Sequence, residues 1–299
     1  MKTWTALCMS ALLFAGAHND AAAAASAADP YSRETWTQAQ KPFRIYGNTY
    51  YVGSHGLGAI LVTSPQGHVL IDSTLPENVA MIEANVRALG FRVRDIKLIL
   101  NTHTHPDHAG GIAELAHDSG AQVAASAKSA KALRLGGDDP DDPQHGLAKP
   151  YAKVTDVRIV TDGEVVTMGP LRLQMHAMPG HTPGSTGWTW RSCEGQRCLS
   201  MVYADSLSLL SNSHYRYADP AHPERLLDFR HTLAVLRALP CDVLMTPHPP
   251  ASFFDKAALI APGKPNPWVD PQACKAYAAQ GQINLEQRVH MDADSHAAR

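Results

Sequence analysis

Four side chains of metal-binding type lie within six positions of one another in the first half of the chain. His103, His105, Asp107 and His108 directly follow an apolar run at 96–100. Imidazole is the commonest zinc ligand, and one carboxylate among imidazoles suits zinc better than softer or harder metals. The apolar run is typical of a buried strand, and sites in open α/β sheets form where strands end. The segment therefore predicts a zinc site.

Two later histidines lie in settings that suit a metal ligand. His181 is in a Pro-Gly-His-Thr-Pro-Gly loop, and His248 is in a Pro-His-Pro-Pro loop. Each follows a strand-like run, and the prolines and glycines make the loops rigid enough to fix a ligand. The six residues complete two sites of three protein ligands each, with His103, His105 and His181 in one and Asp107, His108 and His248 in the other. Three protein ligands per zinc leave a position open for catalysis.

Strands and helices alternate around these residues. Strands are predicted over 43–46, 49–52, 59–63, 68–72, 96–100, 123–125, 157–160, 165–168, 171–175, 188–190, 199–203 and 243–245. Helices are predicted over 76–89, 107–117, 127–135, 223–239 and 271–289. The stretch 136–150 is rich in Asp, Gly and Pro and predicts an exposed loop. Two halves, each with strands before helices, indicate two sheets packed face to face with helices outside, a four-layer α/β arrangement.

The composition limits the classes of partner. The 299 residues include 26 Lys and Arg and 28 Asp and Glu, and 44% are hydrophobic, which is typical of a globular protein with a sizeable core. The sequence has no Lys/Arg stripe, so nucleic acid is not an expected partner. Heptads are also absent, so a monomer is expected.

Residues 1–25 predict an export signal. Lys2 gives a positive start, and Trp4 to Ala17 form an apolar stretch that is too short to span a bilayer. Cleavage after Ala17 or in the following alanine run leaves one domain over 26–299, with no membrane segment, in the periplasm or secreted. The alternative is an uncleaved anchor.

Four cysteines follow the signal. An even number in an exported chain indicates two disulfides, for which three connectivities are possible. We predict Cys193–Cys198 and Cys241–Cys274, and the first pair brackets a polar turn between two strand-like runs. The alternative is a zinc knuckle, but the Cys-x-x-Cys spacing is absent.

The ligand motif and its flanks resemble the metallo-β-lactamase superfamily, and most closely the third subclass of class B β-lactamases. The stretches that carry this resemblance are 67–72, 180–186, 203–208, 237–244 and 245–249. It covers residues 36–277, with weaker support over 136–150. The other two subclasses carry a cysteine ligand, whereas the corresponding segment here reads Asp205-Ser206. The resemblance implies an αβ/βα sandwich of two mixed sheets with helices on both outer faces.

The resemblance also implies an activity. In such an enzyme the six ligands would hold two zinc ions, and a zinc-bound hydroxide would hydrolyse the β-lactam amide bond of penicillins, cephalosporins and carbapenems, giving antibiotic resistance. By the same resemblance, Asp107 is expected to orient the hydroxide, and Ser206 and Ser208 are expected to bind the substrate carboxylate. A 241–274 disulfide is similar to one typical of this subclass.

Two alternatives compete with this interpretation. Another binuclear hydrolase on the same fold would cleave a lactone, thioester or phosphodiester, and Asp205 is a candidate for the metal-bridging aspartate of such relatives. The export signal disfavours the cytoplasmic thioester and RNA substrates. A non-enzymatic zinc-binding protein would saturate its metal with protein ligands, whereas three per site leave room for catalysis.

Overall fold

The computed structural model describes residue 1 and residues 32–297, so the predicted export signal lies outside the described residues. The strands form two sheets. The seven-stranded sheet runs in chain order, β1 (Phe43–Tyr46), β2 (Thr49–Tyr51), β3 (Ile60–Val62), β4 (His68–Ile71), β5 (Ile96–Leu100), β6 (Gln122–Ala125) and β7 (Val157–Ile159). The five-stranded sheet has the order β12 (Val243–Met245), β11 (Arg197–Tyr203), β10 (Thr186–Glu194), β9 (Leu171–Ala177) and β8 (Val165–Met168).

Both sheets are mixed, as predicted. In the larger sheet, β1 to β4 pair antiparallel, and β4 to β7 pair parallel. In the smaller sheet only β11 and β12 pair parallel. The parallel strands end together at one edge of each sheet, and these edges carry the loops with the predicted ligands.

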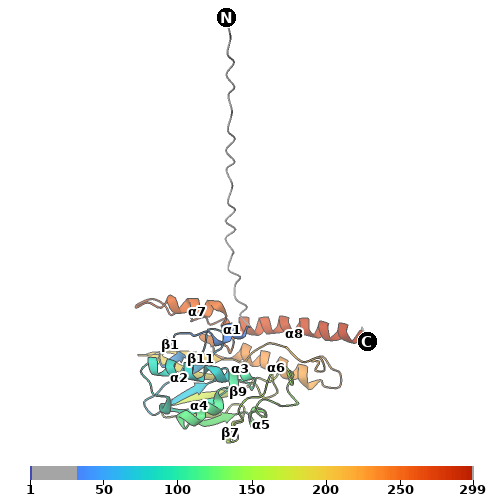
Figure 1. Cartoon of the computed structure of the whole chain (residues 1–299), viewed down its shortest axis with the longest axis horizontal. Coiled ribbons are helices and arrows are strands. Elements are labelled where there is room, and N and C mark those ends of the chain that lie inside the picture. Colours follow the sequence, from blue (N-terminus) through green and yellow to red (C-terminus); the bar gives the residue numbers. More distant parts are fainter. Residues whose placement is uncertain (2–31, 298–299) are drawn as a thin grey trace.

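The described helices, in chain order, are α1 (Arg33–Thr37), α2 (Val79–Ala88), α3 (Pro106–Ala109), α4 (Ile112–Ser119), α5 (Ala127–Leu135), α6 (Glu224–Ala238), α7 (Ala251–Ala258) and α8 (Ala273–Ala297). Two 3-10 turns, Pro76–Asn78 and Val93–Asp95, precede α2 and β5. In Figure 1, α7 and α8 lie along the upper side of the folded part and α4 and α5 near its lower side, with β1, β9 and β11 between them.

Alternation along the strands produces the four layers. Successive side chains of a strand point to opposite faces. Ile60 and Val62 of β3 therefore pack into the core between the sheets, whereas Leu61 packs on the outer face with α2, α4 and α5. In β11, Met201 faces the core between the sheets, and Val202 faces α6 and α8. The predicted αβ/βα sandwich is confirmed.

Several helices differ from the predicted ranges. The helix predicted over 107–117 is two helices, α3 and α4, separated by Gly110 and Gly111. The chain packs tightly here, because a Cβ at Gly110 would lie 2.5 Å from Cδ of Pro76. The helix α8 extends past the predicted end, and α1 and α7 were not predicted.

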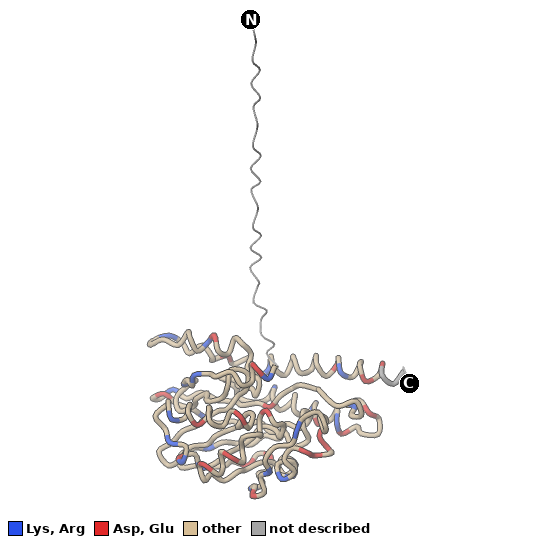
Figure 2. The backbone as a smooth tube through the Cα atoms, in the orientation of Figure 1, with Lys and Arg blue, Asp and Glu red and all other residues tan. Residues whose placement is uncertain are grey.

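Both predicted disulfides are present. Cys193–Cys198 closes the β10–β11 hairpin, and Cys241–Cys274 joins the segment before β12 to the start of α8. None of the helices in the described part of the chain is long and apolar enough to cross a lipid bilayer. Lys and Arg residues are interspersed with Asp and Glu along the backbone (Figure 2).

Candidate metal centre

All six predicted ligands lie beyond the carboxyl ends of strands, where loops of both sheets meet. His103, His105, Asp107 and His108 follow β5, His181 follows β9, and His248 follows β12. The proline in Pro106–Ala109 begins a one-turn helix directly after His105, so Asp107 and His108 turn away from the extended segment before them. Sequence positions that are up to 145 apart are thereby brought to one place.

Three of these histidines form a metal site consistent with zinc. Ligand nitrogens of His103, His105 and His181 lie within 4.8 Å of one another. The three ring centroids are 4.5 to 4.8 Å apart, and each pair of rings is close to perpendicular. Edge-on rings around a shared centre can each direct one nitrogen at the same ion.

In each of the three rings, the nitrogen that faces away from the shared centre, here called the outer nitrogen, is held by a hydrogen bond. Nδ1 of His103 lies 2.7 Å from Asp205 Oδ1, and Nε2 of His105 lies 3.0 Å from Asp142 Oδ1. Nδ1 of His181 donates to the backbone carbonyl of Ser208 over 2.8 Å. Each contact places the ring proton on the outer nitrogen and leaves the lone pair of the other nitrogen for a metal. In agreement, Nε2 of His103 is buried and has no hydrogen-bond partner in the described residues.

The ligand atoms of the second predicted set, Asp107, His108 and His248, also lie close together. Nε2 of His108 lies 3.0 Å from Nε2 of His248 and 3.1 Å from Oδ2 of Asp107, and Nε2 of His248 lies 3.3 Å from that same oxygen. Ligand atoms of one tetrahedral zinc, each at its usual bond length, are separated by about 3.3 Å. Ligand atoms of Asp107 and His108 also lie within 4.8 Å of His103, so the two sets adjoin.

The protonation states favour cation binding. Burial and the neighbouring histidines lower the pKa of His103 and of His181 well below the usual value. Burial raises the pKa of Asp107, but His108 and His248 outweigh this effect and hold it well below its usual range. A metal ligand must be deprotonated, and these groups are therefore in the form that binds a metal.

The segment directly after β4 fixes the backbone of the loop that carries four of the predicted ligands. The carboxylate of Asp72 accepts hydrogen bonds from the backbone N–H and the hydroxyl of Thr102, at 2.7 and 2.9 Å, and from the hydroxyl of Tyr203 at 2.9 Å. Asp72 has φ +64°, a left-handed conformation that few residues other than glycine adopt, and such conformations cluster at functional sites. Ser73 donates its backbone N–H to the carbonyl of His108 over 2.8 Å.

The predicted substrate-binding serines lie beside the histidines. Ser206 is buried and follows Asp205, and Ser208 is exposed and supplies the carbonyl that binds His181. The backbone N–H of Ser208 donates to Oγ of Ser206 over 3.3 Å. On another side of the site, the Trp36 ring lies 5.5 Å from the ring of His248.

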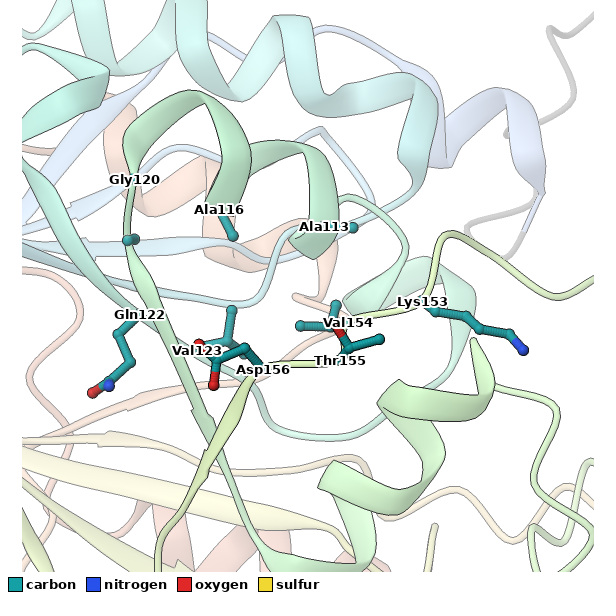
Figure 3. Close-up of a pocket in the computed structure, with 10 residues that line it drawn as sticks. Ala113, Ala116, Gly120, Gln122, Val123, Lys153, Val154, Thr155 and Asp156 are labelled. Atoms are coloured by element: carbon teal, nitrogen blue, oxygen red, sulfur yellow. The ribbon is translucent and has the colours of Figure 1, made fainter.

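A groove elsewhere on the molecule has a different character. It has a volume of about 430 Å³ and is lined by α4, β6 and the segment before β7 (Figure 3). Lys153 and Asp156 are its charged lining residues, and the Lys153 side chain extends away from the others. None of the predicted site residues lines this groove.

Sequence reasoning did not assign the three aspartates that support the ligands. Asp72 was noted only within a stretch that resembles the family, and Asp205 was considered as a bridging ligand. Asp142 lies in the loop predicted to be exposed, yet its side chain is only 7% exposed and contacts His105. The signal that could have found Asp142 and Asp205 is the need of each ligating imidazole for a partner at its outer nitrogen.

The chain is similar to known proteins over most of its length. The metallo-beta-lactamase superfamily model matches residues 59–199. Among solved structures, Rm3 metallo-beta-lactamase is 50% identical, with a TM-score of 0.83 over 86% of this chain and 97% of that one. MEM-A1, a subclass B3 metallo-beta-lactamase isolated from a soil metagenome library, is 44% identical, with a TM-score of 0.83 over 87% and 99% of the two chains. SMB-1, solved in a complex with mercaptoacetic acid, is 41% identical, with a TM-score of 0.80 over 86% and 98%.

The curated relatives match shorter stretches. A hydroxyacylglutathione hydrolase of Anaeromyxobacter dehalogenans is 37% identical over 92 residues, which are 31% of this chain and 28% of that protein. The chain spans 60% of a second relative, an uncharacterized protein of Bacillus subtilis.

Proposed function

The chain belongs to the metallo-beta-lactamase superfamily, and we propose that it is a subclass B3 enzyme that hydrolyses the β-lactam amide bond of penicillins, cephalosporins and carbapenems. Resistance to these antibiotics follows from that activity. The observation that carries the proposal is the pair of adjoining ligand sets, which consist of five histidines and one aspartate and include no cysteine. The chain that carries them is 50% identical in sequence to Rm3 metallo-beta-lactamase.

The residues present fit two zinc ions. His103 Nε2 is a buried nitrogen that has no partner in the described residues, and His105 and His181 point at the same place. Asp107, His108 and His248 suit the second ion by their spacing. When bound, zinc supplies a Lewis acid and a deprotonated water near neutral pH.

The side chains of this protein perform the remaining tasks. The ionised carboxylate of Asp107 orients the attacking water by accepting its hydrogen bond. The hydroxyls of Ser206 and Ser208 donate to the carboxylate that β-lactams carry beside the ring. Opening of the strained ring places a new carboxylate on the former carbonyl carbon and a proton on the former amide nitrogen.

A second candidate is thioester hydrolysis, which the similarity to the hydroxyacylglutathione hydrolase favours. In that case Asp205 would bridge the metals. Here Oδ1 of Asp205 lies 2.7 Å from Nδ1 of His103, the nitrogen on the far side of the ring from Nε2. This contact supports Asp205 as a partner of a ligand and disfavours it as a bridge.

The cellular setting is part of the proposal. Two disulfides are consistent with an oxidising compartment, and we place the protein in the periplasm or outside the cell as a monomer.

The test is to incubate the purified protein with a carbapenem, a chromogenic cephalosporin and a glutathione thioester, with and without a chelator. The expected result is chelator-sensitive opening of both β-lactams, each gaining one water by mass spectrometry, with little thioester cleavage. Rapid thioester cleavage that leaves both β-lactams intact would contradict the proposal and support thioester hydrolysis as the function.

A further inference from the structure

We infer that Asp142 is a positioning residue for the first metal site, and that it couples metal affinity to the docking of the loop 136–150. This inference rests on the proposed zinc function. Asp139 and Asp142 are the two buried carboxylates of an otherwise mostly exposed loop, and Asp142 is the one that contacts a predicted ligand. Its Oδ1 lies 3.0 Å from Nε2 of His105, and both side chains are about nine-tenths buried.

The contact determines which nitrogen of His105 faces the metal. A carboxylate at Nε2 places the ring proton there, so the lone pair is on Nδ1. The contact therefore orients the ring and makes it a stronger electron donor to a cation.

The loop holds Asp142 through its own hydrogen bonds. The backbone N–H of Gln144 donates to Oδ1 of Asp142 over 2.7 Å, and the backbone N–H of Asp142 donates to the carbonyl of Asp139 over 3.0 Å. Lys131 of α5 donates to the carboxylates of Asp139 and Asp141. The position of the Asp142 carboxylate thus depends on the fold of the whole loop.

A second loop is docked on the first and holds another ligand. Asn212 donates its backbone N–H to the carbonyl of Pro143 over 2.8 Å, and its Nδ2 to the carbonyl of His145 over 3.1 Å. The segment that contains Asn212 also contains Ser208, whose carbonyl binds His181. Two of the three ligands of the first site are therefore set by two loops that are hydrogen-bonded to each other.

Reciprocity follows from linkage. If docking of the loops favours the ligand geometry, a bound metal must favour docking of the loops by the same factor. Zinc should then slow amide hydrogen exchange in 136–150. A substitution of Asn212 that weakens the docking should lower zinc affinity, although the described hydrogen bonds of Asn212 include none to a metal ligand.

The test compares Asp142→Ala, Asp142→Asn and Asp156→Asn. Loss of the carboxylate in Asp142→Ala should weaken binding of one zinc ion by about 10- to 100-fold, measured against a chromophoric chelator. Asp142→Asn should lose less, because the amide oxygen still accepts from Nε2–H. Asp156→Asn is the matched control and should bind as wild type, because Asp156 is exposed and lies outside the loop 136–150.

The coupling is tested with Asn212→Asp, which removes the donor to His145 and keeps the oxygen that accepts from His214 and Tyr215. Its zinc affinity should fall by about 2- to 30-fold. Zinc should protect 136–150 from exchange in wild type and not in Asp142→Ala. Thermal unfolding of the zinc-free variants verifies folding.

Wild-type zinc affinity in Asp142→Ala would overturn the inference, and so would amide hydrogen exchange in 136–150 that is equally fast with and without zinc. Either result would leave the proposed function intact. Conversely, these binding measurements need no β-lactam, so they can support the inference even if the protein proves to hydrolyse another substrate.

Discussion

Replacing Asp205 by Ala should weaken one zinc site and spare the other. Asp205 is 1% exposed, and its carboxylate is hydrogen-bonded to Nδ1 of His103. Truncation removes the group that orients this ring and fixes its proton. The Asp205 carboxylate contacts His103, whereas the Asp107 carboxylate contacts His108 and His248, so the second site should keep its affinity.

The size of the effect can be worked from this geometry. Loss of a partner at the outer nitrogen of a ligand costs about 10- to 100-fold in metal affinity, which is about 1.4 to 2.7 kcal/mol. Without zinc, Asp205→Ala should lose less stability than a variant that breaks a buried ion pair. The reason is that burial raises the pKa of Asp205 and so already disfavours its charged form.

The assay is competition for zinc with a chromophoric chelator, which resolves two binding steps. Asp205→Ala should weaken one step, and Asp205→Asn should restore part of the loss, since an amide oxygen can also accept from Nδ1–H of His103. Loss of both steps at once would refute the reasoning and indicate a bridging aspartate. Unchanged binding in both variants would refute it as well.

Three further changes have defined outcomes. Asp107→Ala should lower kcat for a cephalosporin by at least about 100-fold, because it removes a ligand and the group that orients water, and near-normal turnover would exclude this role. Replacing Cys241 and Cys274 together by Ser should lower the free energy of unfolding by about 3.7 kcal/mol in guanidinium, since the bridge spans 33 positions, and an unchanged midpoint would contradict this value. Gly180→Ala should cost about 1–3 kcal/mol in the same assay, because Gly180 has φ +139°. The added methyl would also lie 2.7 Å from Phe229, so wild-type stability would show that the loop relaxes freely.

Periodicity predicted most of the fold because its elements are amphipathic at short range. The helix α5 begins and ends at the predicted residues, Ala127 and Leu135, and Gly136 ends it in a left-handed conformation. The break between α3 and α4 was missed because it depends on close packing of Gly110 against Pro76, a contact between distant segments. The helix α7 was missed because its eight residues make only about two turns, which is too short a stretch to establish a period.

The ligands were predictable because four of them are neighbours in sequence. The groups that orient the ligands were not, since Asp142 is 37 positions from His105 and Asp205 is 102 positions from His103. These pairs form through irregular loops, where no period relates sequence to direction. Spacing therefore predicts candidate metal ligands, and only the folded chain shows which residues contact those ligands and orient them.

The central claim is tested most directly by adding zinc back to the metal-free protein while following hydrolysis of a carbapenem. The account predicts that activity is absent without zinc, returns as zinc is added and reaches its maximum at about two equivalents. A protein that takes up zinc tightly and still leaves the β-lactam ring intact would contradict the account.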